Sequence, residues 1–203
     1  MRKVGVSGLV EGLLIFLKRI RHCAGFGVQS PTDYAFVREV IYERWPYAQY
    51  AELEAKFYGT SRFLLKLSQL LLRVANYAQA SRIGIIGPLP PVMEAHLKAG
   101  CRKSEIWPLP PPSPVGREPI SPSKHPSNES SKILDIEHSG SLPTGEGGGR
   151  GRSSLPLLIA TELNDDWKAY ICQEHIISFD LYYLGIAFYD EKRYREEHVI
   201  NFY

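Results

Sequence analysis

Hydrophobic residues recur at helical spacing through much of residues 1–80. The strongest repeat covers residues 61–79, where apolar side chains three or four positions apart predict one broad buried face. Residues 31–44 predict an earlier helix that begins after Ser30, a good N-cap, and ends at Trp45-Pro46. Proline sets this end because it disfavours the helical conformation in the residue before it. We therefore expect residues 1–80 to form a helical N-terminal extension.

A shorter apolar run, residues 9–17, lies near the N-terminus. Glu11 interrupts it, and basic residues close it: Lys18, Arg19 and Arg21. A bilayer span needs about twenty apolar residues and a signal peptide continues with small neutral ones, so the run indicates an amphipathic helix. Its apolar side consists of Val10, Leu13, Leu14, Leu17 and Ile20. We expect this side to pack against the body of the protein or a partner subunit, with attachment to a membrane surface as the alternative.

The pattern changes at Arg82 to short β-branched runs separated by a helical segment. Residues 82–86 predict a strand, residues 92–98 a helix that stops at the next glycine, and residues 104–107 a second strand. Two strands joined through a helix predict parallel pairing with a right-handed crossover. Residues 81–203 are therefore expected to form an α/β domain.

A further buried strand is expected at residues 157–161. Asn164 or Asp165 can cap the helix that follows, which carries Trp167. Together with Glu162, these are the polar residues nearest to the carboxyl end of that strand. Ligands of open α/β sheets bind at such ends, which makes Glu162, Asn164 and Asp165 candidate binding residues.

The C-terminal residues predict the edge of the sheet. Residues 176–189 are β-branched and aromatic, with Leu184-Gly185 marking a bend or bulge. A charged turn separates this run from residues 198–203, a second β-rich run. Two runs joined by a polar turn predict an antiparallel strand pair at the end of the sheet.

The α/β domain is interrupted between residues 108 and 154. More than half of this stretch is Pro, Gly or Ser and it contains no aromatic residue, so we expect a flexible insertion that is cleaved early by proteases. Residues 132–137 are the exception and predict a brief strand. The glycine tract at residues 145–153 lacks the Gly-Lys-Ser/Thr ending of a phosphate-binding loop, so a linker is the simpler interpretation.

Composition limits the classes of function. The 203 residues are 44% hydrophobic and carry a net charge of +2, which favours a folded protein without a marked preference for nucleic acid. Three well-separated cysteines, Cys23, Cys101 and Cys172, argue against a disulfide framework or a thiolate zinc site and favour the cytoplasm. The six histidines form no close pair, so no metal site is predicted. His96 is expected at the surface.

The turn after residues 82–86 carries the most informative chemistry. A β-run, a turn beginning at Gly87 and a following helix outline the unit that binds nucleotides in many α/β proteins. Such turns are rich in glycine, because the phosphate or cofactor must approach the main chain closely. This chain instead has Pro88, Pro90 and Pro91, which lack a backbone N–H.

Both ends of the chain resemble class I S-adenosylmethionine-dependent methyltransferases, and most closely a bacterial group of small methyltransferase-like proteins. Gln29-Ser-Pro31 and the following helix are similar to the group's N-terminal "HSPF" segment. Trp167 and residues 179–189 (Phe-Asp-Leu-Tyr-Tyr-Leu-Gly-Ile-Ala-Phe-Tyr) are similar to its Trp-bearing helix and "IDLF-xx-GLVFF" strand. The match covers about two-thirds of the chain. Asp180 and Gly185 within it are expected to determine the fold.

The resemblance implies a fold and a cofactor. The fold is a Rossmann-like class I methyltransferase sheet, mostly parallel with an antiparallel C-terminal strand pair, and the cofactor is S-adenosylmethionine. Gly84 and Gly87 fall at the family's first strand and turn, and Glu105 near its ribose-binding acid. Glu162, Asn164 and Asp165 fall near its fifth strand. The resemblance identifies no catalytic residue.

The departures from the family fall on the cofactor site. The family's acidic residue near Gly84 is missing, prolines replace its glycines, and Glu105 lies before the end of its strand. We therefore expect a degenerate methyltransferase-like protein kept for binding or structure, with the N-terminal helices contacting a protein partner or a second copy. The alternatives are an active small-molecule O-methyltransferase with an atypical cofactor loop and an unrelated α/β binding protein.

Overall fold

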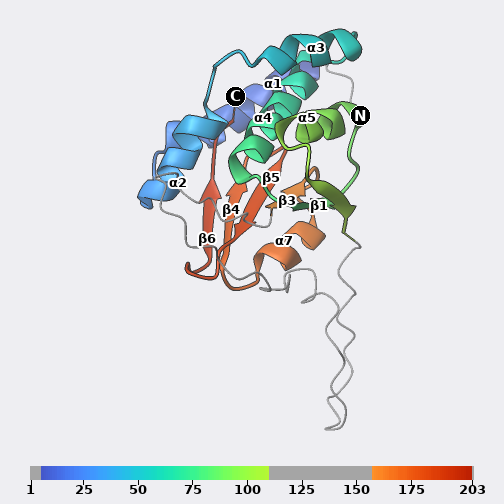
Figure 1. Cartoon of the computed structure of the whole chain (residues 1–203). Coiled ribbons are helices and arrows are strands. Elements are labelled where there is room, and N and C mark those ends of the chain that lie inside the picture. Colours follow the sequence, from blue (N-terminus) through green and yellow to red (C-terminus); the bar gives the residue numbers. More distant parts are fainter. Residues whose placement is uncertain (1–5, 110–156, 203) are drawn as a thin grey trace, which may run out of the picture.

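A computed structural model describes residues 6–109 and 157–202 (Figure 1). The sequence-based expectations for the insertion, including the strand at residues 132–137 and the glycine tract at residues 145–153, lie outside the described residues. The helical elements are α1 (Val6–Lys18), η1 (Ile20–Gly25), α2 (Pro31–Phe36), η2 (Val37–Ile41), α3 (Ala48–Lys56), α4 (Arg62–Ala78), α5 (Pro91–Gly100) and α7 (Asp165–Ile171). The strands are β1 (Arg82–Ile86), β2 (Glu105–Pro108), β3 (Leu157–Ala160), β4 (Ile176–Asp180), β5 (Gly185–Tyr189) and β6 (Glu196–Val199).

The strands form one six-stranded sheet in the order β2-β1-β3-β5-β4-β6. Strands β1, β2 and β3 pair in parallel, and β4 pairs in parallel with β6. Strand β5 alone is antiparallel to its neighbours, β3 and β4. The chain therefore has an α/β fold with a mostly parallel sheet, as expected, and β1, α5 and β2 lie close to their predicted positions.

An antiparallel pair forms from different strands than predicted, and it lies inside the sheet because β6 is the edge strand. Residues 176–189 form the hairpin of β4 and β5, and β6 runs parallel to β4 instead of antiparallel to the preceding run. A tight turn divides the run: Leu181 N–H donates to Leu184 O at 3.0 Å, and Tyr182 N–H donates to Asp180 Oδ1 at 2.7 Å. The turn residues are apolar and aromatic, so their composition resembles strand. The expected bend is therefore a full reversal.

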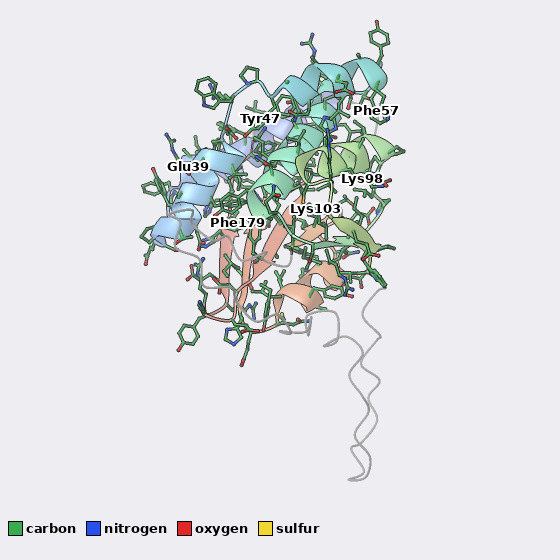
Figure 2. The ribbon with its side chains drawn as sticks, in the orientation of Figure 1. Glu39, Tyr47, Phe57, Lys98, Lys103 and Phe179 are labelled. Atoms are coloured by element: carbon green, nitrogen blue, oxygen red, sulfur yellow. The ribbon has the colours of Figure 1, made fainter. Side chains whose placement is uncertain are left out.

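The larger core lies between the sheet and the layer of α2, α4 and α5, drawn above the sheet in Figure 1. Alternate residues of β1, β3, β4 and β5 point into it, among them Ile83, Ile159 and Phe179, and Figure 2 shows Phe179 between sheet and helices. The predicted apolar face of α4 is buried at its centre, through Leu67, Leu70, Leu71 and Val74. Each such side chain stabilises the fold by roughly 1.5–3 kcal/mol.

Helices α4 and α5 cross closely because Gly100 lies at their contact. A Cβ at this position would overlap the carbonyl oxygen of Leu72 and lie 2.9 Å from the Cβ of Ala75. The glycine that ends the predicted helix is thus also required for helix packing.

Helix α7 covers part of the opposite face of the sheet. Its Trp167 and Ile171 pack on the strand residues that alternate with the larger core, such as Ala160 and Ala187. A Cβ at Gly185 would lie 2.8 Å from the Trp167 ring. Gly185 therefore makes room for the tryptophan, which agrees with its expected role as a fold determinant. Asp180 also serves the fold, through the turn described above and an ion pair with Arg19 at 3.0 Å.

Helix α1 forms as predicted but faces the other way. Among the described side chains of α1, residues 12–18, Ile15 is the buried apolar one, whereas Leu13, Leu14 and Leu17 of the predicted inner side, and Ile20 after the helix, are each more than half accessible to solvent. Val10, the fifth residue of that side, lies outside the described side chains. The expectation that this side packs against the body of the protein is therefore wrong for the four exposed residues, whereas packing against a partner subunit stays a prediction. The chain that follows α1 is attached to the sheet by Arg19, whose guanidinium donates to both carboxylate oxygens of Asp180 at 3.0 Å.

Candidate functional site

The sequence-predicted cofactor turn lies where β1 and β3 reach their carboxyl ends. Gly87 has a φ of +88°, a conformation that favours glycine. The close approach that this glycine permits is used by the protein itself, since a Cβ on Gly87 would lie 2.7 Å from Thr161 Oγ1. The Thr161 hydroxyl donates to Pro88 O at 2.9 Å, and the main-chain N–H of Thr161 donates to Ile86 O at 3.0 Å. These bonds join the turn after β1 to the chain leaving β3.

Gly84 lies within β1, on the face of the sheet that α7 covers. A Cβ at Gly84 would lie 3.0 Å from both Leu109 Cδ1 and Leu158 Cδ1. Leu109 N–H donates to Ile85 O at 2.8 Å, which continues the pairing of β2 with β1 beyond the end of β2. Leucine side chains therefore fill the space in front of Gly84.

Two of the acidic candidates, Glu162 and Glu105, lie at opposite ends of β1. Glu162 lies beside Gly87, with its Cγ 3.5 Å from the position of a Gly87 Cβ. Glu105 lies at the start of β2, opposite Arg82 with 3.7 Å between the charged atoms, and so at the amino end of the parallel strands. The structure brings Gly87 and Glu162 together but leaves Glu105 at the other end of β1.

The two remaining candidates belong to the start of α7. Asn164 Oδ1 accepts from Trp167 N–H at 3.1 Å, so of the two predicted caps Asn164 is the observed one. Asp165 is exposed and pairs with Lys168 at 3.0 Å. An acidic first turn of this kind stabilises a helix through the helix dipole. Both side chains therefore have roles in the helix itself.

The strongest polar cluster lies elsewhere, between α2 and β6. Asp33 is buried, and Arg193 donates to its two carboxylate oxygens at 2.5 and 2.6 Å. His198 Nε2 lies 2.9 Å from Asp33 Oδ2, and Glu196 lies 3.2 Å from Arg193. Arg193 also donates to Ser30 Oγ, the N-cap of α2, at 3.2 Å. We call these five residues the Asp33 cluster.

The charges of the Asp33 cluster stabilise one another. Burial by itself would raise the pKa of Asp33, but the hydrogen bonds and positive charge of Arg193 and His198 outweigh it and hold the pKa well below its ordinary value. The same hydrogen bond raises the pKa of Arg193 further above its ordinary value. At neutral pH the cluster therefore holds an ion pair that ties the N-terminal helices to the last strand.

The Asp33 cluster also offers one ligand atom each from Asp33, Glu196 and His198 within 4.8 Å of one another. The guanidinium of Arg193 already forms ion pairs with two of these residues, Asp33 and Glu196. A cavity of about 50 Å³ adjoins the cluster, with an aromatic lining that includes Phe36 and Phe179. The arrangement is that of a structural ion pair, and the predicted lack of a metal stays a prediction.

A larger cavity, of about 350 Å³, opens between η1, η2 and the C-terminal segment. We call it the basic cavity, because its lining contains two arginines and no carboxylate: Phe16, Cys23, Ala24, Arg38, Tyr42, Arg44 and Asn201. Tyr42 donates its hydroxyl to Asn201 O, and Asn201 Nδ2 donates to Phe16 O at 3.2 Å. Its volume suits a small ligand and its charge favours an anion.

Sequence reasoning missed both the Asp33 cluster and the basic cavity. Their residues are spread from the N-terminal helices to the C-terminus, so no local spacing connects them. The available signal was the Ser30-Pro31 start of α2, the helix that brings Asp33 to the cluster. His96 was also misplaced: it is fully buried, and its Nδ1 bonds Val92 O at 2.7 Å. Within the described residues its Nε2 is the buried side-chain atom without a hydrogen-bond partner.

Comparison of the chain with protein-family models, curated proteins and solved structures found no match. Helices long and apolar enough to cross a bilayer are absent from residues 6–109 and 157–202. The sheet, the Asp33 cluster and the basic cavity are therefore the observations on which a functional conclusion depends.

Proposed function

We propose that this chain is a methyltransferase-like protein that has lost methyl transfer and acts as a binding module, with the binding surface on its N-terminal helices. The reversed strand β5, set into an otherwise parallel sheet, supports the resemblance to class I methyltransferases, whose sheet contains such a strand.

The contact between Thr161 and Gly87 carries the proposal. A nucleoside cofactor needs the open face of the glycine turn and its free amides, and here the Thr161 side chain occupies that face. Three of the six residues from 87 to 92 are prolines and supply no N–H. The residues present do not fit S-adenosylmethionine.

The position of Glu105 adds independent support. In the family an acidic residue at the end of the second strand holds the ribose hydroxyls. Glu105 pairs with Arg82 at the start of β2, and the strand ends in Pro108. No carboxylate of β2 is therefore available at the edge where Gly87 lies.

Thermal unfolding with S-adenosylmethionine and with S-adenosylhomocysteine tests the proposal. A ligand at a hundred times its Kd stabilises a protein by about 2.7 kcal/mol, which for this chain length raises the Tm by roughly 5–10 °C. We expect no shift with either compound at about 1 mM, a ligand excess that would reveal any micromolar Kd. A functional class I methyltransferase, run in parallel, controls for ligand quality.

A shift with both compounds would contradict the proposal. If it came with transfer of a labelled methyl group to small hydroxylated acceptors, the alternative of an active O-methyltransferase would replace it.

A further inference from the structure

Helix α1 presents a row of apolar side chains to solvent. Leu13 and Leu17 are four positions apart and so share one side of the helix, with Leu14 next to Leu13, and Ile20 follows at the start of η1. We call these four residues the α1 apolar face; each is 52–58% exposed. Single exposed leucines are ordinary, but a contiguous row of this kind marks a surface that binds something apolar.

The basic cavity opens beside the α1 apolar face. Phe16 lines the cavity and lies three positions after Leu13 on α1, where it is a helical neighbour of that exposed leucine. The apolar face therefore adjoins the cavity that Arg38 and Arg44 line. A guanidinium donates two parallel hydrogen bonds to a phosphate, which makes a pair of arginines in a cavity well suited to a phosphate group.

Several cations around this surface lack a carboxylate partner within ion-pair distance in the described part of the chain. Among the described residues no ion pair is formed by the exposed cations Lys18, Arg21, Arg38 and Arg44. By contrast, Arg19 and Arg193 both have carboxylate partners. Burial lowers the pKa of Lys66, and repulsion from Arg44 and Arg73 lowers it further, which is the effect of a positive local potential.

The combination of apolar and cationic groups distinguishes the possible occupants. A second copy docked on the same face would bring these unpaired cations against their own equivalents, which costs binding energy. An apolar protein partner would cover the leucines and leave the arginines without a ligand. The surface of an anionic bilayer satisfies both, because acyl chains accept the leucines while headgroup phosphates meet the arginines.

We propose that the α1 apolar face and the basic cavity together dock this protein on an anionic membrane surface, with Leu13, Leu17 and Ile20 in the acyl boundary and a headgroup phosphate held by Arg38 and Arg44. The inference rests on the proposed function, since it names the partner of that binding module. It involves residues remote from the Gly87 turn, so the cofactor experiments and the membrane experiment succeed or fail separately.

Vesicle co-sedimentation of the full chain tests the inference. We expect binding to phosphatidylcholine vesicles containing about 30 mol% phosphatidylglycerol, and much weaker binding to pure phosphatidylcholine, because each basic residue near an anionic surface strengthens binding about fivefold. Raising the salt concentration to about 0.5 M should weaken the binding, because it shortens the Debye length.

Two double variants separate the apolar from the cationic contribution. Arg38→Gln with Arg44→Gln should weaken binding to the anionic vesicles about 25-fold, at about fivefold for each cation. Leu13→Gln with Leu17→Gln should weaken it at least about tenfold, since it removes apolar area that enters the acyl boundary. The matched control is Arg102→Gln with Lys103→Gln, which removes the same charge from the turn between α5 and β2, where Figure 2 labels Lys103, and should bind nearly as wild type.

Three results would overturn the inference. The first is that the folded wild-type chain does not bind the anionic vesicles, or that all three double variants lose vesicle binding equally. Circular dichroism confirms in each case that the chain is folded. The second is a concentration-dependent dimer, detected by light scattering, that Leu13→Gln with Leu17→Gln abolishes; it would identify a second copy as the occupant. The third is tight binding of inorganic phosphate through Arg38 and Arg44 without vesicle binding, which would identify a soluble anion.

Discussion

Replacing Arg193 by Leu should reveal how strongly the Asp33 cluster holds the N-terminal helices to the sheet. Arg193 donates to both oxygens of Asp33 at 2.5 and 2.6 Å, and the Asp33 side chain is only 4% exposed. Without the guanidinium a buried carboxylate keeps His198 as its side-chain partner, at 2.9 Å. The variant therefore leaves a charge buried with most of its compensation removed.

The expected loss follows from this geometry. Removing one partner of a buried ion pair costs about 3–5 kcal/mol. Arg193 is 22% exposed and a small cavity adjoins the pair, so solvent can partly replace it. We therefore expect Arg193→Leu to lower the free energy of unfolding by about 3 kcal/mol, at the lower end of that range. Glu196→Gln removes the cluster's more exposed carboxylate and should cost less than about 1 kcal/mol.

The loss should also depend on pH. In the wild type the pKa of Asp33 is held below its unfolded value of 3.8, so its stabilisation is complete above that value and disappears as the pH falls through the folded pKa. In Arg193→Leu the guanidinium no longer offsets burial, which raises the pKa of Asp33. As the pH falls, Asp33 therefore becomes protonated in the folded variant, and the cost of its buried charge is removed. The difference in stability between the two proteins should therefore shrink between pH 7 and about pH 3.

Urea unfolding followed by tryptophan fluorescence measures these differences, and urea is preferable to guanidinium chloride because it does not screen charge. The variants Asp33→Asn, Arg193→Leu and their combination complete a double-mutant cycle, with an expected coupling of about 1.5–3 kcal/mol. Additive losses, or a cost of Arg193→Leu no greater than that of Glu196→Gln, would refute the assignment of a buried ion pair.

Three further predictions concern packing, pH and the turn after β1. Gly100→Ala should destabilise the protein by about 2–3 kcal/mol in urea unfolding because its Cβ overlaps the Leu72 carbonyl oxygen, and a wild-type midpoint would contradict the close contact between α4 and α5. Burial lowers the pKa of His96, so as the pH falls below about 6.5 this histidine takes up a proton in the unfolded chain before it does so in the folded protein. The free energy of unfolding should therefore fall by up to about 1.4 kcal/mol per pH unit in this range, and His96→Leu should remove the slope. Thr161→Val should cost about 0.5–1.5 kcal/mol through the lost hydrogen bond to Pro88 O, without creating affinity for S-adenosylhomocysteine; binding by the variant would mean that the hydroxyl alone closes the turn.

The parts of the fold that were predictable have local causes. Strand β1 is an isoleucine-rich run between Ser81 and Gly87-Pro88, and Pro91 and Gly100 delimit α5. The caps at Ser30 and Asn164 were also readable, because a side-chain oxygen accepts the N–H three residues later.

What could not be predicted depends on partners distant in sequence. The side of α1 that faces the protein is set by Ile15 and by the Arg19–Asp180 ion pair, 161 residues apart, whereas hydrophobic spacing alone favoured the side with more leucines. The ionised Asp33 cluster joins residues about as far apart. For the candidate site, the sequence indicated that prolines remove amides, but the contact of Thr161 with Gly87 required the structure.

Calorimetric titration of the full chain with S-adenosylhomocysteine tests the central claim most directly. With ligand up to about 1 mM, the proposed function predicts heats equal to those of dilution, because Thr161 lies against Gly87 and the prolines supply no N–H at the turn after β1. A saturating one-to-one isotherm with a micromolar Kd would contradict the account.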